Sequence, residues 1–322
     1  MADNERSLYA GVDLGGTKIE TVVLKGGKVA GSDRVQTPRT GAEDVIEAIA
    51  QSVRSALESA KASAQDLAAV GVGSPGVIGQ DGSVGSAKNV PGFEGAPVAV
   101  ASELTKKLGA NEIKVDNDVR VAVRGEWKRG AGRPYTDMLG VFVGTGVGGG
   151  LVLDNKLLLG RGAAGEIGHT LVREGGRVCS CGMEGHLESY AGRGRMEARA
   201  RHLHERGEKT ELFELMRKRG RDRITSGVIH AAIERDDKMA KKFIDEAVWA
   251  LGIALANAQN LLDLEAIIVG GGLGDRLGQP FVSRIEEAVR DRLFVPDKAP
   301  RFLTTELGDL SGAVGAAVLA GG

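Results

Sequence analysis

Several features that mark common protein classes are scarce or missing in this sequence of 322 residues. Its two cysteines, Cys179 and Cys181, are too few and too close together for the disulfide framework of a small secreted domain. The beginning, MADNERSLYAG, lacks the apolar core of a signal peptide. The late apolar run 313–320 is far shorter than the ~20 residues that span a membrane. We therefore expect a cytoplasmic globular protein with no membrane partner.

Neither sign of charge is in excess, because 42 lysines and arginines stand against 43 aspartates and glutamates. A net charge of −1 creates no field that would draw the whole chain onto nucleic acid, so we expect no nucleic-acid partner. Only eight prolines are present and no Gly-X-Y period runs through the chain, which excludes collagen. The length predicts two domains of roughly 150 residues each.

Glycine is the residue that the sequence has in excess. It accounts for 49 of the 322 residues, or about 15%, whereas the usual share is ~7%. Glycine weakens helices and strands by roughly 0.5–1 kcal/mol per site, so an excess indicates loops in which the backbone bends sharply or approaches a ligand closely. The places where glycines gather are therefore the first candidates for ligand binding.

The hydrophobic pattern predicts a similar order of elements twice. Strands at 8–13 and 19–24 enclose a glycine loop, and a capping box over Thr40–Glu43 opens a helix at 42–62. A second meander of glycine-broken strands runs over 138–159. The other expected elements are strands at 67–73, 112–115 and 266–269, and helices at 102–108, 118–129, within 193–262 and at 312–319. Strand ends that carry loops, with helices between them, indicate an α/β fold in two related halves.

Two well-known phosphate loops are excluded by their context. The pattern G-x-G-x-x-G occurs at 71–76 and 144–149, but neither match is followed directly by the helix that would face a pyrophosphate. The order Gly16-Thr17-Lys18 also inverts the Gly-Lys-Ser/Thr of a P-loop. The sequence therefore disfavours a Rossmann dehydrogenase and a P-loop enzyme.

Two glycine turns remain as phosphate-binding candidates. Asp13-x-Gly-Gly-Thr17 lies in the first half of the chain and Gly144-Thr-Gly146 in the second. Each offers backbone N–H groups and a threonine hydroxyl. Facing each other across a cleft, the pair would cradle a triphosphate, and Asp13 would hold its Mg²⁺. Either turn by itself is equally well an ordinary tight β-turn.

These turns belong to a longer series of motifs. In chain order the series is Asp13-Leu-Gly-Gly-Thr-Lys18, Asn117-Asp118, Gly144-Thr-Gly-Val-Gly-Gly149, Gly165-Glu-Ile-Gly-His169, Cys179-Ser-Cys-Gly-Met-Glu-Gly185 and Gly270-Gly-Gly-Leu-Gly274. From residue 8 to the end, the chain resembles the ROK family (repressors, uncharacterised reading frames and sugar kinases) of the actin/hexokinase-like ATPase superfamily. The resemblance implies two ribonuclease-H-like, actin-like ATPase domains of α/β class around a central cleft, and a homodimer. The first domain would comprise 1–117 and 306–322, so that the final helix returns to it, and the second 118–305.

The resemblance also implies which residues bind ligands. For a sugar these are Asn89, Asn117, Asp118, Glu166, His169 and Glu188. For ATP and its Mg²⁺ they are Asp13, Gly15, Gly16, Thr17, Lys18, Gly144, Thr145, Gly146, Gly271 and Gly272. Two of them have simpler interpretations, since Asn89 precedes a turn that its side chain would stabilise and Lys18 would suit a solvated hairpin.

Asp118 is the candidate general base. Phosphoryl transfer to a sugar hydroxyl needs a base at the acceptor, and Asp118 is an acid at a predicted strand end, beside Asn117. The resemblance makes Asn117 and Asp118 the sugar-binding and catalytic pair. A helix N-cap is the alternative role for Asp118, and both roles are compatible. Asp116 should point the other way along the strand, which favours a structural role.

The two cysteines suggest a metal site. Cys179-x-Cys181, with His169 ten residues earlier, suits tetrahedral zinc if a fourth ligand exists. The family that the chain resembles usually has a third cysteine where this chain has His186. Imidazole is also a good zinc ligand, so we expect a structural zinc ion held by His169, Cys179, Cys181 and His186. The alternative is a pair of small buried thiols with His186 as a loop residue.

One segment is locally basic, since 193–223 carries 11 lysines and arginines and 6 acids. A nucleic-acid surface is conceivable, because some members of the family are repressors that carry an N-terminal helix-turn-helix. Too few residues precede the first strand here for such a motif, so a solvated helix face is the favoured interpretation.

The leading functional prediction is an ATP-dependent glucokinase that phosphorylates the 6-hydroxyl. Kinases for mannose, fructose or an N-acetylhexosamine, polyphosphate as the donor, and a non-catalytic sugar sensor remain alternatives. An actin-like filament ATPase is disfavoured by the metal-like loop.

Overall fold

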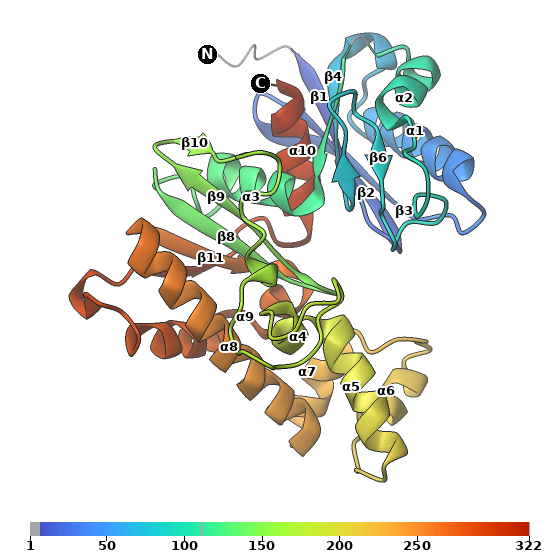
Figure 1. Cartoon of the computed structure of the whole chain (residues 1–322). Coiled ribbons are helices and arrows are strands. Elements are labelled where there is room, and N and C mark those ends of the chain that lie inside the picture. Colours follow the sequence, from blue (N-terminus) through green and yellow to red (C-terminus); the bar gives the residue numbers. More distant parts are fainter. Residues whose placement is uncertain (1–6, 111, 322) are drawn as a thin grey trace. The chain divides into compact units, whose positions relative to one another are not determined.

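The computed structural model describes residues 7–110 and 112–321 and divides into two compact units. Unit 1 comprises Met1–Arg133 and Asp309–Gly322, and unit 2 comprises Pro134–Gly308. Figure 1 shows that each unit has its own sheet with helices beside it. No helix in the described ranges combines the length and apolar character needed to cross a membrane.

Unit 1 is built on a five-stranded sheet with the order β3-β2-β1-β4-β7. Its strands are β1 (Leu8–Leu14), β2 (Lys18–Lys25), β3 (Lys28–Gln36), β4 (Leu67–Ser74) and β7 (Ile113–Asn117). Its helices are α1 (Ala42–Ser59), α2 (Val100–Leu108), α3 (Asp118–Arg129) and α10 (Ser311–Gly321), with a small ribbon of β5 (Val77–Ile78) and β6 (Val84–Gly85). β1 pairs antiparallel with β2 and parallel with β4, so the first glycine turn joins two neighbouring strands.

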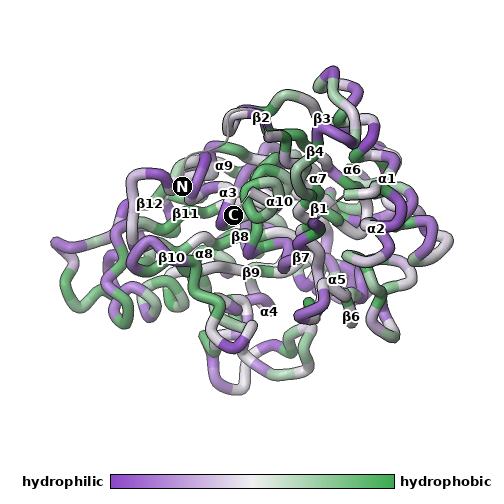
Figure 2. Tube along the Cα trace, turned by 90° about the horizontal axis from the view of Figure 1, so that it is seen from above, coloured by the Kyte–Doolittle hydropathy of each residue, from purple (hydrophilic) through white to green (hydrophobic). Residues whose placement is uncertain are grey.

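The last helix of the chain, α10, has no polar face (Figure 2), and most of its residues are buried. It is made largely of alanine and glycine, which lets it approach β1, β4 and α3 closely. Gly125 of α3 lies against Ser311, and Gly315 of α10 lies against Val121. The helix therefore returns to unit 1 (Figure 1). The boundary expected after residue 117 differs from this division, because the packing of α3 on α10 keeps α3 in unit 1.

Unit 2 repeats the strand arrangement, with the order β10-β9-β8-β11-β12. Its strands are β8 (Met138–Val143), β9 (Val147–Leu153), β10 (Lys156–Leu157), β11 (Ala266–Gly270) and β12 (Arg301–Thr304). Its helices are α4 (Glu188–Ala191), α5 (Arg193–Glu205), α6 (Leu212–Lys218), α7 (Ser226–Glu234), α8 (Lys238–Leu262) and α9 (Gly271–Arg290). As in unit 1, three antiparallel strands are followed by two parallel ones, which confirms the prediction of two related α/β halves.

The predicted helical periodicity is confirmed where the pattern is longest. In α1 the apolar positions Val45, Ile49 and Val53 are fully buried. The expected capping box at Thr40–Glu43 is wrong, because the N-cap is Gly41 and no side chain caps this end. The helix is stabilised instead by the burial of its apolar face, which contributes more than a single cap does.

Candidate active site

The first glycine turn is a hairpin between β1 and β2, as the sequence predicts. The N–H of Gly15 donates to the carbonyl of Lys18 at 2.9 Å and closes the turn. Thr37, just after β3, holds the turn from outside: its hydroxyl donates to the Gly15 carbonyl at 2.6 Å and its N–H to the Thr17 carbonyl at 3.1 Å. Nothing in the sequence marked Thr37, because its partners come from a different part of the chain.

Asp13 stands at the end of β1, directly before this hairpin. Its half-buried side chain lies against Gly312, at the beginning of α10. Desolvation and the nearby negative charge of Asp118 raise the pKa of Asp13 to about 7, although Lys18 acts in the opposite direction. A carboxyl group that is held partly neutral by its surroundings is suited to receive a cation, since a cation removes the electrostatic cost of its charge.

Asp118 opens α3 where β7 ends, as predicted. The helix is capped by Asn117 rather than by Asp118: the Asn117 side-chain oxygen accepts from the N–H groups of Val119 and Arg120, at 3.0 and 3.1 Å. Asn117 also donates its amide hydrogen to Asp118 Oδ1 at 3.0 Å. Asn117 therefore fixes the Asp118 carboxylate at the first turn of the helix, and the cap alternative for Asp118 is not needed.

Asp116 has the structural role that the strand alternation predicts. Its carboxylate pairs with the guanidinium of Arg120 at 2.7 Å, one helical turn along α3. Both side chains are largely buried, at 14% and 13% exposure. Of the two acids that flank Asn117, this one is held in an ion pair by the first helix turn.

Lys18 lies between two acids, with a side chain that is 39% exposed. Its ammonium lies 3.3 Å from Glu20 and 3.4 Å from Asp309, and Arg34 pairs with the same Glu20 at 2.5 Å. Acids therefore outnumber bases around the first hairpin, once Asp13 is included. Sequence spacing did not indicate Arg34 or Asp309, which come from β3 and from the segment before α10.

Asn89 is brought to the first hairpin by its backbone, which lies against Gly16. The turn at Asn89 is closed by the Val90 N–H, which donates to the Ala87 carbonyl at 2.9 Å. The Asn89 side chain is exposed and makes no hydrogen bond within the described part of the chain, so the turn-stabilising alternative is wrong. In unit 1 the predicted residues thus gather around the ends of β1 and β7.

The second glycine turn is also a hairpin, between β8 and β9. Gly146 lies directly against the Glu188 carboxylate, and a Cβ at this position would overlap it. Oε2 of Glu188 accepts a hydrogen bond from the Val147 N–H at 3.0 Å. Glu188, only 9% exposed, therefore holds the hairpin through its hydrogen bond to Val147 and its contact with Gly146.

The glycines after β11 reach the same place. Gly271 begins α9 with φ at +80°, a conformation that side chains other than glycine rarely adopt, and it lies against Val143. Gly272 lies beside the Ser226 hydroxyl at the beginning of α7. Unit 2 therefore brings together the two glycine segments that the resemblance assigned to the nucleotide.

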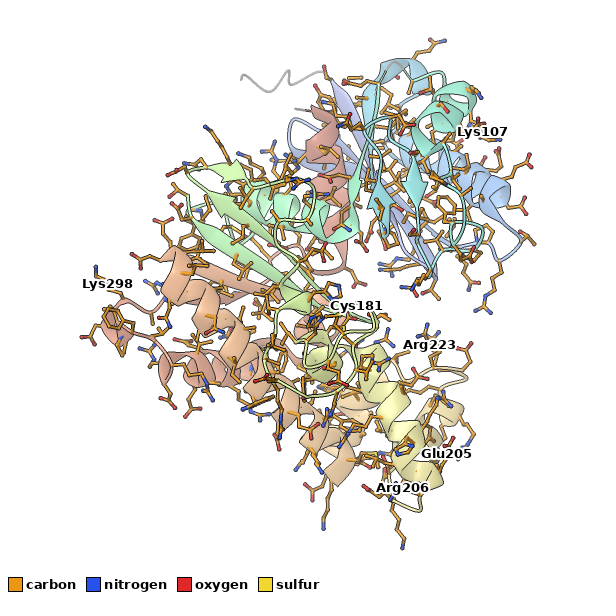
Figure 3. The ribbon with its side chains drawn as sticks, in the orientation of Figure 1. Lys107, Cys181, Glu205, Arg206, Arg223 and Lys298 are labelled. Carbon is orange, nitrogen blue, oxygen red and sulfur yellow. The ribbon has the colours of Figure 1, made fainter. Side chains whose placement is uncertain are left out.

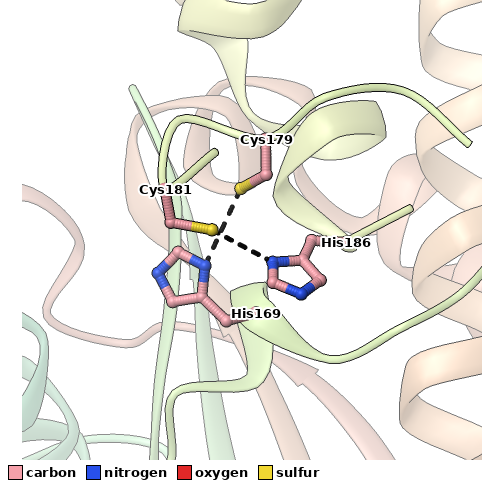
Figure 4. A group of neighbouring side chains, drawn as sticks. All are labelled: His169, Cys179, Cys181 and His186. Carbon is pink, nitrogen blue, oxygen red and sulfur yellow. Dashed lines mark hydrogen bonds between the residues drawn. The ribbon is translucent and has the colours of Figure 1, made fainter. Parts of the chain in front are cut away.

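The four predicted metal ligands form one cluster (Figure 4). Cys179 Sγ lies 3.7 Å from His169 Nδ1, and Cys181 Sγ lies 3.3 Å from His186 Nδ1. All four ligand atoms lie within 4.8 Å of one another. Ligands of tetrahedral zinc stand about 2.0–2.3 Å from the ion, which separates them by about 3.3–3.8 Å. The donor set and its spacing fit a four-coordinate metal with His186 in place of a third cysteine.

Glu188 connects this cluster to the second hairpin. Its Oε1 accepts from the Ser180 hydroxyl and lies 3.6 Å from Cys179 Sγ, while its other oxygen bonds Val147. Burial raises the pKa of the Cys179 thiol, and the charge of Glu188 adds to the effect. A bound cation would favour the thiolate instead. Because Ser180 and Val147 donate to its two oxygens, the carboxylate of Glu188 is already hydrogen-bonded within the protein at both.

Glu166 precedes a single turn of 3₁₀ helix at Ile167–His169, and His169 is the last residue of this turn. Glu166 is exposed and lines a cavity of about 310 Å³ in unit 2. The cavity is mostly apolar and is closed on another side by Asn257 and Ala258 of α8. The turn thus directs His169 to the metal cluster and leaves Glu166 at the surface.

Sequence reasoning missed Arg193. It begins the basic segment that was interpreted as a solvated face, but its guanidinium donates to the Thr145 hydroxyl at 2.6 Å. The prediction fits better elsewhere in the segment, since Glu205, Arg206 and Arg223 are exposed (Figure 3). The only sequence signal for Arg193 is its place directly after the glycine-rich loop.

Comparison with known proteins gives a consistent result. The model of the ROK family matches residues 9–322. A glucokinase from Halalkalibacterium halodurans is 34% identical over 315 residues, which are 95% of this chain and 93% of that protein. An N-acetylgalactosamine kinase from Shewanella sp. is 31% identical over 329 residues, 98% of this chain and 97% of the relative. The crystal structure of a ROK family glucokinase from Streptomyces griseus in complex with glucose and AMPPNP is 32% identical, with a TM-score of 0.79 and coverage of 98% and 99%.

Proposed function

The chain belongs to the ROK family, and we propose that it is an ATP-dependent glucokinase that transfers the γ-phosphoryl group to the 6-hydroxyl of glucose. Sugar kinase activity is supported by the similarity to glucokinases over nearly the whole chain. Use of ATP is supported by the related glucokinase structure with glucose and AMPPNP. The choice of glucose and of the 6-hydroxyl is the finer part of the proposal.

The mechanism rests on one observation in unit 1. Asp13 at the end of β1 and Asp118 at the beginning of α3 are close enough for the charge of Asp118 to raise the pKa of Asp13. Asp118 is held by Asn117 and is the general base, which takes the proton of the attacking sugar hydroxyl. Asp13, whose pKa is raised by burial and by the charge of Asp118, would hold the Mg²⁺ of the nucleotide through water. When bound, this ion neutralises charge on the phosphates.

The glycine segments supply N–H groups and hydroxyls to the phosphates. In unit 1 this set is Gly15, Gly16, Thr17 and Lys18, and in unit 2 it is Gly144, Thr145, Gly146, Gly271 and Gly272. Lys18 would exchange its ion pair with Asp309, whose side chain is 63% exposed, for a phosphate oxygen. An exposed pair of this kind contributes little stability, so the exchange costs little.

The sugar is assigned to polar groups of both units. These are Asn89, Asn117 and Asp118 in unit 1, and Glu166, His169 and Glu188 in unit 2. Glu188 is the least accessible of them, since Val147 and Ser180 already bond its oxygens. It would either bind sugar through a remaining lone pair or act by holding the loop that carries His169.

A structural zinc ion completes the proposal for unit 2. His169, Cys179, Cys181 and His186 would fill its four positions, which leaves none for a substrate. The ion would fix the loop that runs from the 3₁₀ turn at Ile167–His169 to α4, at whose two ends the proposed sugar ligands Glu166, His169 and Glu188 lie.

An N-acetylhexosamine kinase is the second candidate. It is favoured by the N-acetylgalactosamine kinase from Shewanella sp., whose identity to this chain is only slightly below that of the glucokinases. Sugar kinases separate such substrates by contacts to one or two groups, so overall similarity does not decide between them.

The test is a coupled assay of ADP release over a panel of hexoses and N-acetylhexosamines, with ATP and polyphosphate compared as donors. We expect the highest kcat/KM with glucose and ATP. Asp118→Asn should lower kcat by about 10²- to 10⁴-fold, the usual contribution of a general base. The neighbouring Asp116→Asn is the control and should keep kcat within a few fold. The proposal would be refuted if the enzyme phosphorylated none of these sugars, or if Asp118→Asn kept the activity of the wild type.

A further inference from the structure

Arg193 is built into the second glycine hairpin at both its backbone and its side chain. Its N–H donates to the Gly144 carbonyl at 3.0 Å, and the next N–H, of Gly194, donates to the Thr145 carbonyl at 2.8 Å. Its guanidinium then reaches forward to Thr145 Oγ1 and sideways to the Ile224 carbonyl, at 2.6 Å each. The first turn of α5 is therefore attached to the tip of the hairpin.

The guanidinium of Arg193 has no ion pair of its own. Among the described residues no acidic oxygen lies within ion-pair distance of it. Glu197 acts on it from farther away and already pairs with Arg201 at 2.6 Å and with Arg223 at 3.8 Å. Burial lowers the pKa of Arg193 and Arg223 lowers it further, while Glu197 raises it in part. A half-buried guanidinium is costly in this state unless an anion joins it.

The contact with Thr145 also decides how that hydroxyl is used. A threonine hydroxyl has one hydrogen to donate and lone pairs that accept. Because Arg193 donates to Thr145 Oγ1, the hydroxyl accepts on that side and its own hydrogen is left to point at another acceptor. An anion beside the hairpin would then meet the guanidinium, the Thr145 hydroxyl and the hairpin N–H groups together.

We propose that Arg193 is a phosphate-binding and positioning residue of unit 2, which holds the Thr145 hydroxyl as a donor and contacts the phosphate chain of the nucleotide. The inference rests on the proposed function, because it takes the phosphates to lie at the second hairpin. Arginine suits the role, since its planar guanidinium binds two groups of the protein and still presents donors to an anion.

Nucleotides with and without phosphates separate this role from a merely structural one. If Arg193 only stabilised the fold of the hairpin, its loss would weaken ADP and adenosine alike. If it contacts phosphate, ADP is weakened and adenosine is not. The chain offers a matched control in Arg195 on the same helix turn, whose guanidinium donates to the Val178 carbonyl at 2.6 Å and does not touch the hairpin.

The experiment is calorimetric titration of the full-length protein with ADP and with adenosine, for the wild type and three variants. Arg193→Gln should weaken ADP binding by about 10- to 100-fold, the range for hydrogen bonds to charged groups, and change adenosine binding less than twofold. Arg193→Lys, which keeps the charge but not the fork, should be intermediate. Arg195→Gln should bind both ligands like the wild type.

The outcomes distinguish the two proposals. ADP binding by Arg193→Gln at wild-type strength, or an equal loss for ADP and adenosine, would overturn the role of Arg193 while the kinase assignment stands. A wild type that binds no ADP at all would overturn the proposed function and this inference with it. A thermal unfolding transition like that of the wild type serves as the evidence that each variant has folded.

Discussion

The two glycine hairpins have the same local design and opposite surroundings. Each joins antiparallel strands through a short turn that carries a threonine. The first is surrounded mainly by acids, namely Asp13, Glu20, Asp118 and Asp309, with Lys18 and Arg34 among them. The second has at its tip the guanidinium of Arg193, which makes no direct ion pair with the described residues.

The difference teaches that the turn itself does not decide what it binds. Backbone N–H groups favour anions in both hairpins. The added carboxylates make the first suitable for a metal-bound phosphate, in which the cation faces the acids. The added guanidinium makes the second suitable for a bare phosphate oxygen. Asp118, Asp309 and Arg193 come from other elements of the same unit, whereas Asp13 and Glu20 lie on the strands of the first hairpin itself.

The largest expected effect tests the acidic side of this comparison. Asp13→Asn should lower kcat/KM by about 100-fold or more by removing the proposed Mg²⁺ carboxylate, and yet should stabilise the metal-free protein. The folded-state pKa of Asp13, about 7, lies above its ordinary value, so the folded state holds the extra proton between about pH 4 and pH 7. The free energy of unfolding therefore falls as pH rises through this range, by up to roughly 4 kcal/mol.

The measurement is urea unfolding at pH 5 and pH 8 without divalent ions. Asp13→Asn should be more stable than the wild type at pH 8, and the difference should shrink at pH 5, where wild-type Asp13 is protonated. Glu58→Gln, at an exposed position of α1, is the control and should match the wild type at both values. If the stability difference between Asp13→Asn and the wild type were the same at pH 5 and pH 8, the raised pKa of Asp13 would be contradicted.

The second effect concerns the proposed zinc site of His169, Cys179, Cys181 and His186, which Glu188 links to the second hairpin. Removing the ion by chelation should release Glu188 from the loop of Cys179 and Ser180, so the Val147 amide that Glu188 accepts from should exchange its hydrogen faster, by about tenfold. Hydrogen exchange with mass spectrometry should detect this in peptides over 144–149 and no change over 14–19. Metal analysis of the pure protein should find one zinc per chain.

Two variants sharpen this result. Cys179→Ser should lose the metal and reproduce the exchange of the chelated protein. Ser180→Ala should keep the metal and speed up exchange in the 144–149 peptide only in part, because Oε2 of Glu188 retains its bond to Val147. Protection of this peptide that does not depend on the metal would refute the connection.

The smallest expected effect is on the support of the first hairpin. Thr37→Val keeps the shape of this buried side chain but removes its hydrogen bond to the Gly15 carbonyl, which should cost about 1 kcal/mol of stability. Thr37→Ser keeps the hydroxyl and is the control for that bond. Thermal unfolding should rank the wild type above Thr37→Val, with increased exchange over 14–19 and none over 144–149. Equal exchange in both hairpins would show that the two are not held independently.

The elements that the sequence predicted well are those with a long regular pattern or a glycine that punctuates it. Both hairpins, the strand end at Asn117 and the helix behind it follow from alternation and from residue type. The capping box at Thr40–Glu43 failed because a cap is worth only about 1 kcal/mol and the burial of the α1 face outweighs it. The boundary predicted after residue 117 differs from the division after Arg133, because the packing of α3 on α10 joins segments far apart in the chain.

For the candidate site the division is similar. The ligand spacing of the metal loop is local, so the cluster of His169, Cys179, Cys181 and His186 could be expected, including the histidine in place of a third cysteine. Thr37 and Arg193 could not, because each acts on a hairpin that lies at least twenty residues away in the sequence. No local pattern encodes such a contact.

The sequence alone determined that this chain is an α/β protein with two glycine hairpins, an acid at the end of a strand and a cluster of residues that could hold a metal ion, since each depends on residue type and short spacing. The tertiary structure decided which charges surround each hairpin, that Asn117 and not Asp118 caps α3, and that Glu188 links the metal loop to β9. The reason is physical. Hydrogen bonds and Coulomb interactions act over a few ångströms in space, whatever the separation along the chain.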